Sequence, residues 1–92
     1  MTVRYDPDFL QRLKKLNVRI RNSFIEKIAI FLQDPNNLEL NNHSLTREYL
    51  GYRSINVTND YRALYIEKTE GDTTIAYFTA IGTHEELYGE VK

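Results

Sequence analysis

The sequence contains no cysteine, which excludes a disulfide framework and a metal site built on thiolates. It has only two histidines, and no HExxH spacing accompanies them, so a structural zinc site is not expected. We expect no cofactor. No apolar run is long enough to cross a membrane, and the first residues lack the apolar core of a signal peptide. We therefore expect a cytoplasmic protein that makes no membrane contact.

The chain also lacks a strong charge of either sign, since its formal net charge is −1. Global charge therefore does not indicate nucleic-acid binding. The distribution is uneven: residues 1–34 carry seven Lys and Arg against four Asp and Glu, and residues 35–92 carry five against nine. Four cations cluster where two helices are predicted to meet: Lys14, Lys15, Arg19 and Arg21. Such a cluster is most often a solvated helical face, and the alternative is a local phosphate-contacting patch.

What the sequence does contain suffices for one small soluble domain, residues 1–92, with 41% hydrophobic and 27% charged residues. Its second half predicts three strands rich in β-branched and aromatic residues: Gly51–Val57, Tyr61–Lys68 and Thr73–Ile81. Connections this short require antiparallel neighbours, so these strands form a meander. Thr2–Tyr5 is predicted to be an edge strand.

Two helices are predicted between the edge strand and the meander. Asp6 is an N-cap residue with proline after it, and this helix runs to about Leu16. Asn17 can cap a second helix, which Asp34 and the proline after it end near residue 33. Their apolar faces need a partner, and only the sheet can provide one. The predicted fold is α+β, in the order β-α-α-β-β-β, with a helical hairpin on one face of a twisted antiparallel sheet. Residues 35–42 are predicted to be a loop.

Side-chain alternation predicts which strand residues face the helices. The expected core residues are Ile55, Val57, Leu64 and Ile66. The expected outward residues are Ser54, Asn56, Ala63 and Tyr65. Arg62 would then share the core face with Leu64, from which it would have to escape at the strand end or through a bulge.

Several short motifs follow one another in a familiar order. They are His43-Ser44-Leu45, Gly51-Tyr52-Arg53, Asp60-Tyr61, Gly82-Thr83-His84 and a terminal aromatic, Tyr88. Their order and spacing resemble the RelE superfamily of type II toxin–antitoxin toxins, and most closely its YafQ-like branch, over essentially the whole chain. The resemblance implies a ribosome-dependent endoribonuclease, an mRNA interferase, that cuts mRNA in the decoding site. It also implies a cognate antitoxin that forms a heteromeric complex with the toxin and blocks its site.

The resemblance implies catalytic roles for His43, Asp60 and His84, and substrate contacts for Tyr61 and Tyr88. Tyr61 stands where the YafQ-like branch usually has tryptophan. Each residue also has an ordinary structural role open to it. His43 can bond the backbone, Asp60 can form an Asx-turn, and His84 can simply be exposed.

Metal-free RNA cleavage needs a base for the ribose 2′-hydroxyl, a cation for the phosphoryl oxygens and an acid for the departing 5′-oxygen. Histidine suits the acid and base because its unperturbed pKa lies near neutrality, and the planar fork of arginine suits phosphate. We assign His84 as the acid, and Asp60 or His43 as the base or an orienting group. Arg62, which matches a functional arginine of RelE, is the expected phosphate cation, although it could instead pair with an acidic neighbour. Weaker candidates for substrate contact are Arg47, Arg53 and Asn56.

Two positions depart from the YafQ-like pattern. Asn56 stands where that pattern has a histidine, and Ala80 stands where it has an arginine. Three functions therefore stay open: an mRNA-cleaving toxin, a ParE-like toxin that inhibits DNA gyrase by contact, and an inactive toxin-fold partner of an antitoxin. The two histidines and Asp60 favour the first over the second, whereas the two departures favour the third.

Overall fold

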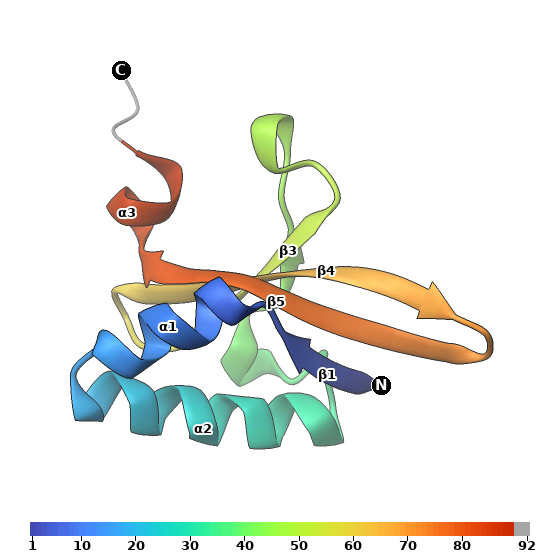
Figure 1. Ribbon diagram of the computed structural model, residues 1–92, viewed down its shortest axis with the longest axis horizontal. Helices are drawn as coiled ribbons and strands as arrows, with labels where there is room; N and C mark the ends of the chain where they lie inside the picture. The colour runs from blue at the N-terminus through green and yellow to red at the C-terminus, as the bar shows by residue number, and fades with distance from the viewer. Residues whose placement is uncertain (90–92) are drawn as a thin grey trace.

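Figure 1 shows a computed structural model of the chain, in which residues 1–89 are described. Within these residues, two helices lie together on one face of a five-stranded sheet, and a short third helix follows the last strand. The elements in order are β1 (Thr2–Tyr5), α1 (Pro7–Lys15), α2 (Val18–Gln33), the 3₁₀ turn η1 (Leu38–Leu40), β2 (His43–Ser44), the 3₁₀ turn η2 (Arg47–Tyr49), β3 (Tyr52–Asn56), β4 (Tyr61–Glu70), β5 (Thr73–Thr83) and α3 (His84–Tyr88). The predicted α+β class and helical hairpin are confirmed.

The sheet has the order β1-β5-β4-β3-β2. β3, β4 and β5 are successive antiparallel neighbours, as the short connections predicted. β1 lies parallel to β5 and forms one edge, with Thr2 opposite Ile75. β2, which the sequence did not predict, pairs with β3 and forms the other edge.

The predicted caps fix both helices. The Asp6 carboxylate accepts a hydrogen bond from the Asp8 backbone N–H at 2.8 Å, with proline at the first helical position. The Asn17 side chain accepts from the Arg19 N–H at 2.8 Å and begins α2 only three residues after α1 ends. The two helices are therefore held as a tight hairpin over the sheet.

A cluster of buried aromatic rings joins the helices to the sheet. It contains Phe9 from α1, Phe24 and Phe31 from α2, Tyr65 from β4 and Phe78 from β5. The ring centroids of Tyr65 and Phe78 are 5.0 Å apart, and those of Phe9 and Phe24 are 5.3 Å apart. Full burial of such a side chain contributes roughly 1.5–3 kcal/mol. This cluster helps to hold the hairpin on one face of the sheet.

The predicted facing of β4 was wrong by one residue. Ala63 and Tyr65 belong to the core under the helices, whereas Leu64 is buried on the opposite face. Arg62 does share a face with Leu64, but this face lies away from the helices. Arg62 therefore does not lie in the core between sheet and helices. Alternation misled because the centre of β4 is buried on both sides. By contrast, Ile55 of β3 faces the core as predicted.

The connection over residues 35–42 is more ordered than a plain loop. Asn37 caps η1 by accepting a hydrogen bond from the Glu39 N–H, and Leu40 in this turn is fully buried. Asn41, which follows, adopts a left-handed backbone with φ of 47°. This segment therefore anchors the chain just before β2, which carries His43.

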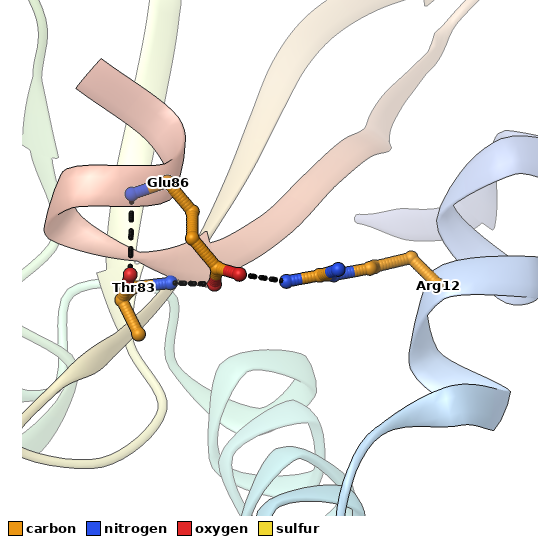
Figure 2. Close-up of polar contacts among 3 residues, drawn as sticks. All are labelled: Arg12, Thr83 and Glu86. Atoms are coloured by element: carbon orange, nitrogen blue, oxygen red, sulfur yellow. Dashed lines mark hydrogen bonds and ion pairs between the residues drawn. The ribbon is translucent and has the colours of Figure 1, made fainter. Parts of the chain in front are cut away.

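The third helix is fixed by a capping box and by an ion pair to α1 (Figure 2). The Thr83 hydroxyl accepts from the Glu86 N–H at 3.1 Å, and the Glu86 carboxylate accepts from the Thr83 N–H at 2.8 Å. The same carboxylate pairs with Arg12. The hydrogen bond from Thr83, followed by that from Arg12, lowers the pKa of Glu86. These contacts hold the start of α3, and with it His84, against the body of the domain.

Candidate active site

A cleft of about 440 Å³ lies on the sheet face opposite the helical hairpin. Four of the sequence-predicted site residues line it: His43, Arg62, His84 and Tyr88. The strand register explains how they meet. His43 of β2 lies opposite Ser54 of β3, and Arg62 of β4 lies opposite Gly82 of β5, two residues before His84. Cross-strand partners point to the same side of a sheet, so these positions converge on one face.

The orientation of His43 is set by one hydrogen bond. Its Nδ1 lies 2.8 Å from the backbone oxygen of Asn41. A carbonyl oxygen only accepts, so Nδ1 must carry the hydrogen, and Nε2 of the neutral ring is the proton acceptor. The left-handed backbone of Asn41 turns this carbonyl toward the ring. The exposed imidazole of His43 is thus arranged to take a proton at Nε2.

Arg62 is a half-buried cation anchored by the β3–β4 turn. Its Nη1 donates to the backbone oxygens of Thr58, Asn59 and Tyr61 at 2.8, 3.0 and 3.0 Å. Among the described residues it forms no ion pair with a carboxylate, and its Nε and Nη2 make no hydrogen bond. The guanidinium is therefore held in place while most of its donors stay available to an anion.

The opposite wall of the cleft is aromatic. The rings of His84 and Tyr88 are 4.7 Å apart, one helical turn from each other on α3. Tyr88 meets Tyr49 of η2 edge-on at 5.3 Å, and the Tyr49 hydroxyl donates to the backbone oxygen of Leu87. The turn η2 and helix α3 are thereby joined beside the cleft, and this contact confines the position of His84.

Two buried polar atoms near the cleft have no hydrogen-bond partner among residues 1–89: Ser54 Oγ and Asn56 Oδ1. Ser54 lines the cleft and is only 1% exposed. The sequence reasoning placed both residues outward but gave Ser54 no role, and it also missed Asn41 and Tyr49 as cleft residues. For Ser54 a signal existed, because alternation sets it on the face opposite the core residue Ile55.

Other expected site residues lie outside this cleft. Asp60 and Tyr61 line a neighbouring hollow, which shares His84 with the cleft. Arg47 is exposed and adopts a left-handed backbone, with φ of 57°. Asn56 lies opposite Arg62, one row along the same face.

Arg53 points to the helix side of the sheet. Its Nε donates to the Asn42 amide oxygen at 2.8 Å, and the Asn42 amide nitrogen donates to the Tyr65 hydroxyl at 2.7 Å. Burial raises the pKa of Tyr65, so this hydroxyl stays neutral inside the core. Arg53 thus completes a polar network that lets Tyr65 be buried.

Within residues 1–89, no three side chains of the His, Cys, Asp or Glu type gather as metal ligands would. None of the helices in this part of the chain has both the length and the apolar character needed to cross a membrane.

The comparisons with known proteins agree on the fold. A model of the family described as ParE toxin of type II toxin–antitoxin system, parDE, matches residues 3–88. A comparison with curated proteins gives no match.

Among solved structures, YafQ from Escherichia coli strain BL21(DE3) is similar at 22% identity with a TM-score of 0.74, over 95% of this chain and 97% of that one. The YoeB/ParE toxin from Agrobacterium tumefaciens is similar at 15% identity with a TM-score of 0.73, over 91% and 99%. The toxin–antitoxin complex RelBE2 from Mycobacterium tuberculosis contains a chain that is 24% identical, with a TM-score of 0.70, over 90% and 96%.

Proposed function

The chain belongs to the ParE toxin family of type II toxin–antitoxin systems, within the ParE/RelE superfamily, and from this premise we propose that it is a metal-independent, ribosome-dependent mRNA endoribonuclease. The observation that carries the proposal is the convergence of His43, Arg62 and His84 on one cleft. A toxin that acts by contact alone does not require two histidines and an anchored arginine around a common cavity.

The three side chains supply the parts that the chemistry needs. Nε2 of His43 takes the proton of the ribose 2′-hydroxyl, whose oxygen then attacks the adjacent phosphorus. Arg62 stabilises the negative charge that grows on the phosphoryl oxygens. His84, in its protonated form, donates a proton to the departing 5′-oxygen. The products are a 2′,3′-cyclic phosphate and a free 5′-hydroxyl.

The structure favours His43 over Asp60 as the base, because His43 lines the cleft and Asp60 does not. The departure at position 80 is also accommodated. Ala80 lies opposite Leu64, which shares the cleft-side face with Arg62. Arg62 can therefore provide the cation that position 80 lacks.

The proposed partners are an antitoxin and the ribosome. Solved structures similar to this chain include the RelBE2 complex and the DinJ–YafQ complex of Escherichia coli, each a toxin with its antitoxin. We propose that this chain likewise forms a heteromeric complex with a cognate antitoxin, and that the free toxin acts on ribosomes carrying mRNA in the cytoplasm.

The family model that matches the chain is that of ParE, so inhibition of DNA gyrase is the second candidate. The two functions are separated by assaying the same purified protein for ribosome-dependent mRNA cleavage and for inhibition of gyrase supercoiling. If the protein inhibits supercoiling and cuts no mRNA, the proposed function is wrong and gyrase inhibition takes its place.

The decisive test of the site is primer extension on mRNA bound to programmed ribosomes. We expect discrete cuts that require ribosomes, and we expect His84→Ala to reduce the cleavage rate by about 10²–10⁴-fold, the range for loss of a general acid. Arg62→Ala removes the proposed phosphate cation and should also slow cleavage. Its matched control is Arg4→Ala, which removes an exposed arginine at the far edge of the sheet. An unchanged rate in His84→Ala would remove this residue from the mechanism.

A further inference from the structure

Two more hollows lie near the cleft among the described residues, and each shares lining residues with its neighbour. The first, of about 530 Å³, shares His84 with the cleft and is also lined by Asp60, Tyr61 and Glu85. The second, of about 480 Å³, shares Asp60 and Tyr61 with the first and reaches Arg19 on α2. The shared residues therefore set the three hollows in a series, from the cleft past His84 and over the β3–β4 turn to the start of α2.

Figure 1 shows how the elements that line these hollows are arranged. The helix α3, the connection between β3 and β4, and the junction of α1 with α2 all lie at the left end of the molecule, one above another. We call this surface, made by Asp60, Tyr61, Glu85 and Arg19, the edge track.

The two ends of the edge track differ in chemistry. Near His84 it offers a tyrosine ring and the carboxylates of Asp60 and Glu85. At its far end lies Arg19, which makes no ion pair among the described residues, and Lys14 and Lys15 precede it at the helix junction. An anion is repelled by the first end and attracted by the second.

Single-stranded nucleic acid fits this pattern. Its bases stack on aromatic rings and donate hydrogen bonds from their amino groups to carboxylates, while its phosphates seek cations. The junction of α1 and α2, which carries these cations, is fixed by hydrogen bonds. Arg21 donates to the backbone oxygens of Lys14 and Leu16, and so holds the end of α1 against the start of α2.

We propose that the edge track binds the single-stranded RNA that extends from the scissile nucleotide. A base stacks on Tyr61 with its polar edge toward Asp60, and a phosphate further along contacts Arg19. The inference rests on the proposed function, because it takes the strand in the cleft to be RNA with its scissile linkage at His84.

The test is fluorescence anisotropy with RNA whose 2′-hydroxyls are methylated, so that it cannot be cut. A trinucleotide and an oligonucleotide of about nine nucleotides are titrated into the wild type, Arg19→Ala and Arg4→Ala at several salt concentrations. For the longer RNA we expect Arg19→Ala to weaken binding about three- to tenfold and to reduce the slope of log K against log salt by about 0.7, the value for one phosphate contact. The trinucleotide should bind Arg19→Ala and Arg4→Ala with equal affinity.

Tyr61→Leu keeps an apolar side chain against the core and removes the stacking ring, so about tenfold weaker binding of the longer RNA is expected. The inference is overturned if Arg19→Ala leaves the salt slope unchanged, if Arg4→Ala has the same effect, or if the wild type fails to bind the longer RNA at low salt.

A ribosome assay separates this inference from the proposed function. With mRNA on programmed ribosomes, Arg19→Ala should raise KM and leave kcat unchanged, as loss of uniform binding does. Cleavage with an unaltered KM in Arg19→Ala would reject the edge track and keep the endoribonuclease. No cleavage by the wild type would reject the endoribonuclease, and the anisotropy titration would still decide whether the edge track binds RNA.

Discussion

Ser54 presents a buried hydroxyl that costs the folded chain free energy. The residue is 1% exposed and its Oγ has no partner among the described residues. Leaving such a group unpaired costs roughly 1–3 kcal/mol, whereas alanine at the same position buries a methyl group of nearly the same size. We therefore predict that Ser54→Ala stabilises the protein by about 1 kcal/mol. For a domain of this length, that corresponds to an increase in Tm of about 4–8 °C.

The measurement is thermal unfolding followed by far-ultraviolet circular dichroism, with Ser44→Ala as the control. Ser44 is exposed on the neighbouring strand β2, so its replacement should change the stability by less than about 0.5 kcal/mol. A Tm of Ser54→Ala that falls by several degrees would refute the reasoning, because it would mean that the hydroxyl is satisfied in the folded chain.

The same variant bears on function. A polar group that destabilises the fold and lies in the cleft is expected to serve a ligand, since stability is commonly sacrificed at binding sites. We therefore expect Ser54→Ala to cleave mRNA more slowly than the wild type although it is more stable. Full activity together with higher stability would show that the hydroxyl has no part in substrate binding.

Three other substitutions test how the site is held. Gly82→Ala places a methyl group 3.1 Å from Glu86 Oε1 and 3.2 Å from Glu86 Cβ, so we expect a loss of about 1–3 kcal/mol in thermal unfolding and slower mRNA cleavage as α3 shifts. Arg47→Gly relieves a left-handed backbone that costs roughly 1–2 kcal/mol, but the freer unfolded chain costs roughly 0.5–1 kcal/mol of this gain. We expect the free energy of unfolding to rise by about 0.5–1 kcal/mol in denaturant unfolding, and a decrease would contradict the reasoning. Because the pKa of Glu86 is lowered in the folded chain, its stabilisation is present above the ordinary value of 4.5 and is lost as pH falls through the lowered pKa. Glu86→Gln should therefore be less stable than the wild type at pH 7 and nearly equal to it at strongly acidic pH, and a difference independent of pH would argue against this role.

Local signals in the sequence predicted most of the fold. The caps at Asp6 and Asn17 mark both helix starts, and the short turns between β3, β4 and β5 leave only an antiparallel meander. Each of these features depends on residues that are close together in the chain. β2 could not be found in this way, because a strand of two residues carries no periodic pattern and exists only through its pairing with β3.

The candidate site, too, could be predicted only in part. The motifs carried by the resemblance located His43, Arg62, His84 and Tyr88, and the structure brings these four together. Alternation from Ile55 already sets Arg53 on the helix side, but the sequence could not show its partner, because Asn42 lies in a connection without regular structure.

The same limit explains the wrong face of β4. Tyr65 is buried because Asn42 satisfies its hydroxyl, and Leu64 is buried although it lies away from the helices. Neither fact can be read from the alternation of β4 itself. The sequence therefore predicted which chemical groups are candidates, whereas tertiary contacts determine which of them line one cavity.

The pairing of β1 with β5 has a consequence for how the protein is made. Thr2 lies opposite Ile75, so β1 must wait for β5 to be synthesised, roughly 4–15 s later at ordinary rates of translation. His84 follows β5 and is added later still, whereas His43 lies near the middle of the chain. Until β4 and β5 are made, the helical hairpin lacks the sheet that it packs against, and the cleft cannot form. A copy of the enzyme proposed here would thus be inactive throughout its own elongation, and could not cut the message from which it is being translated until its sheet closes.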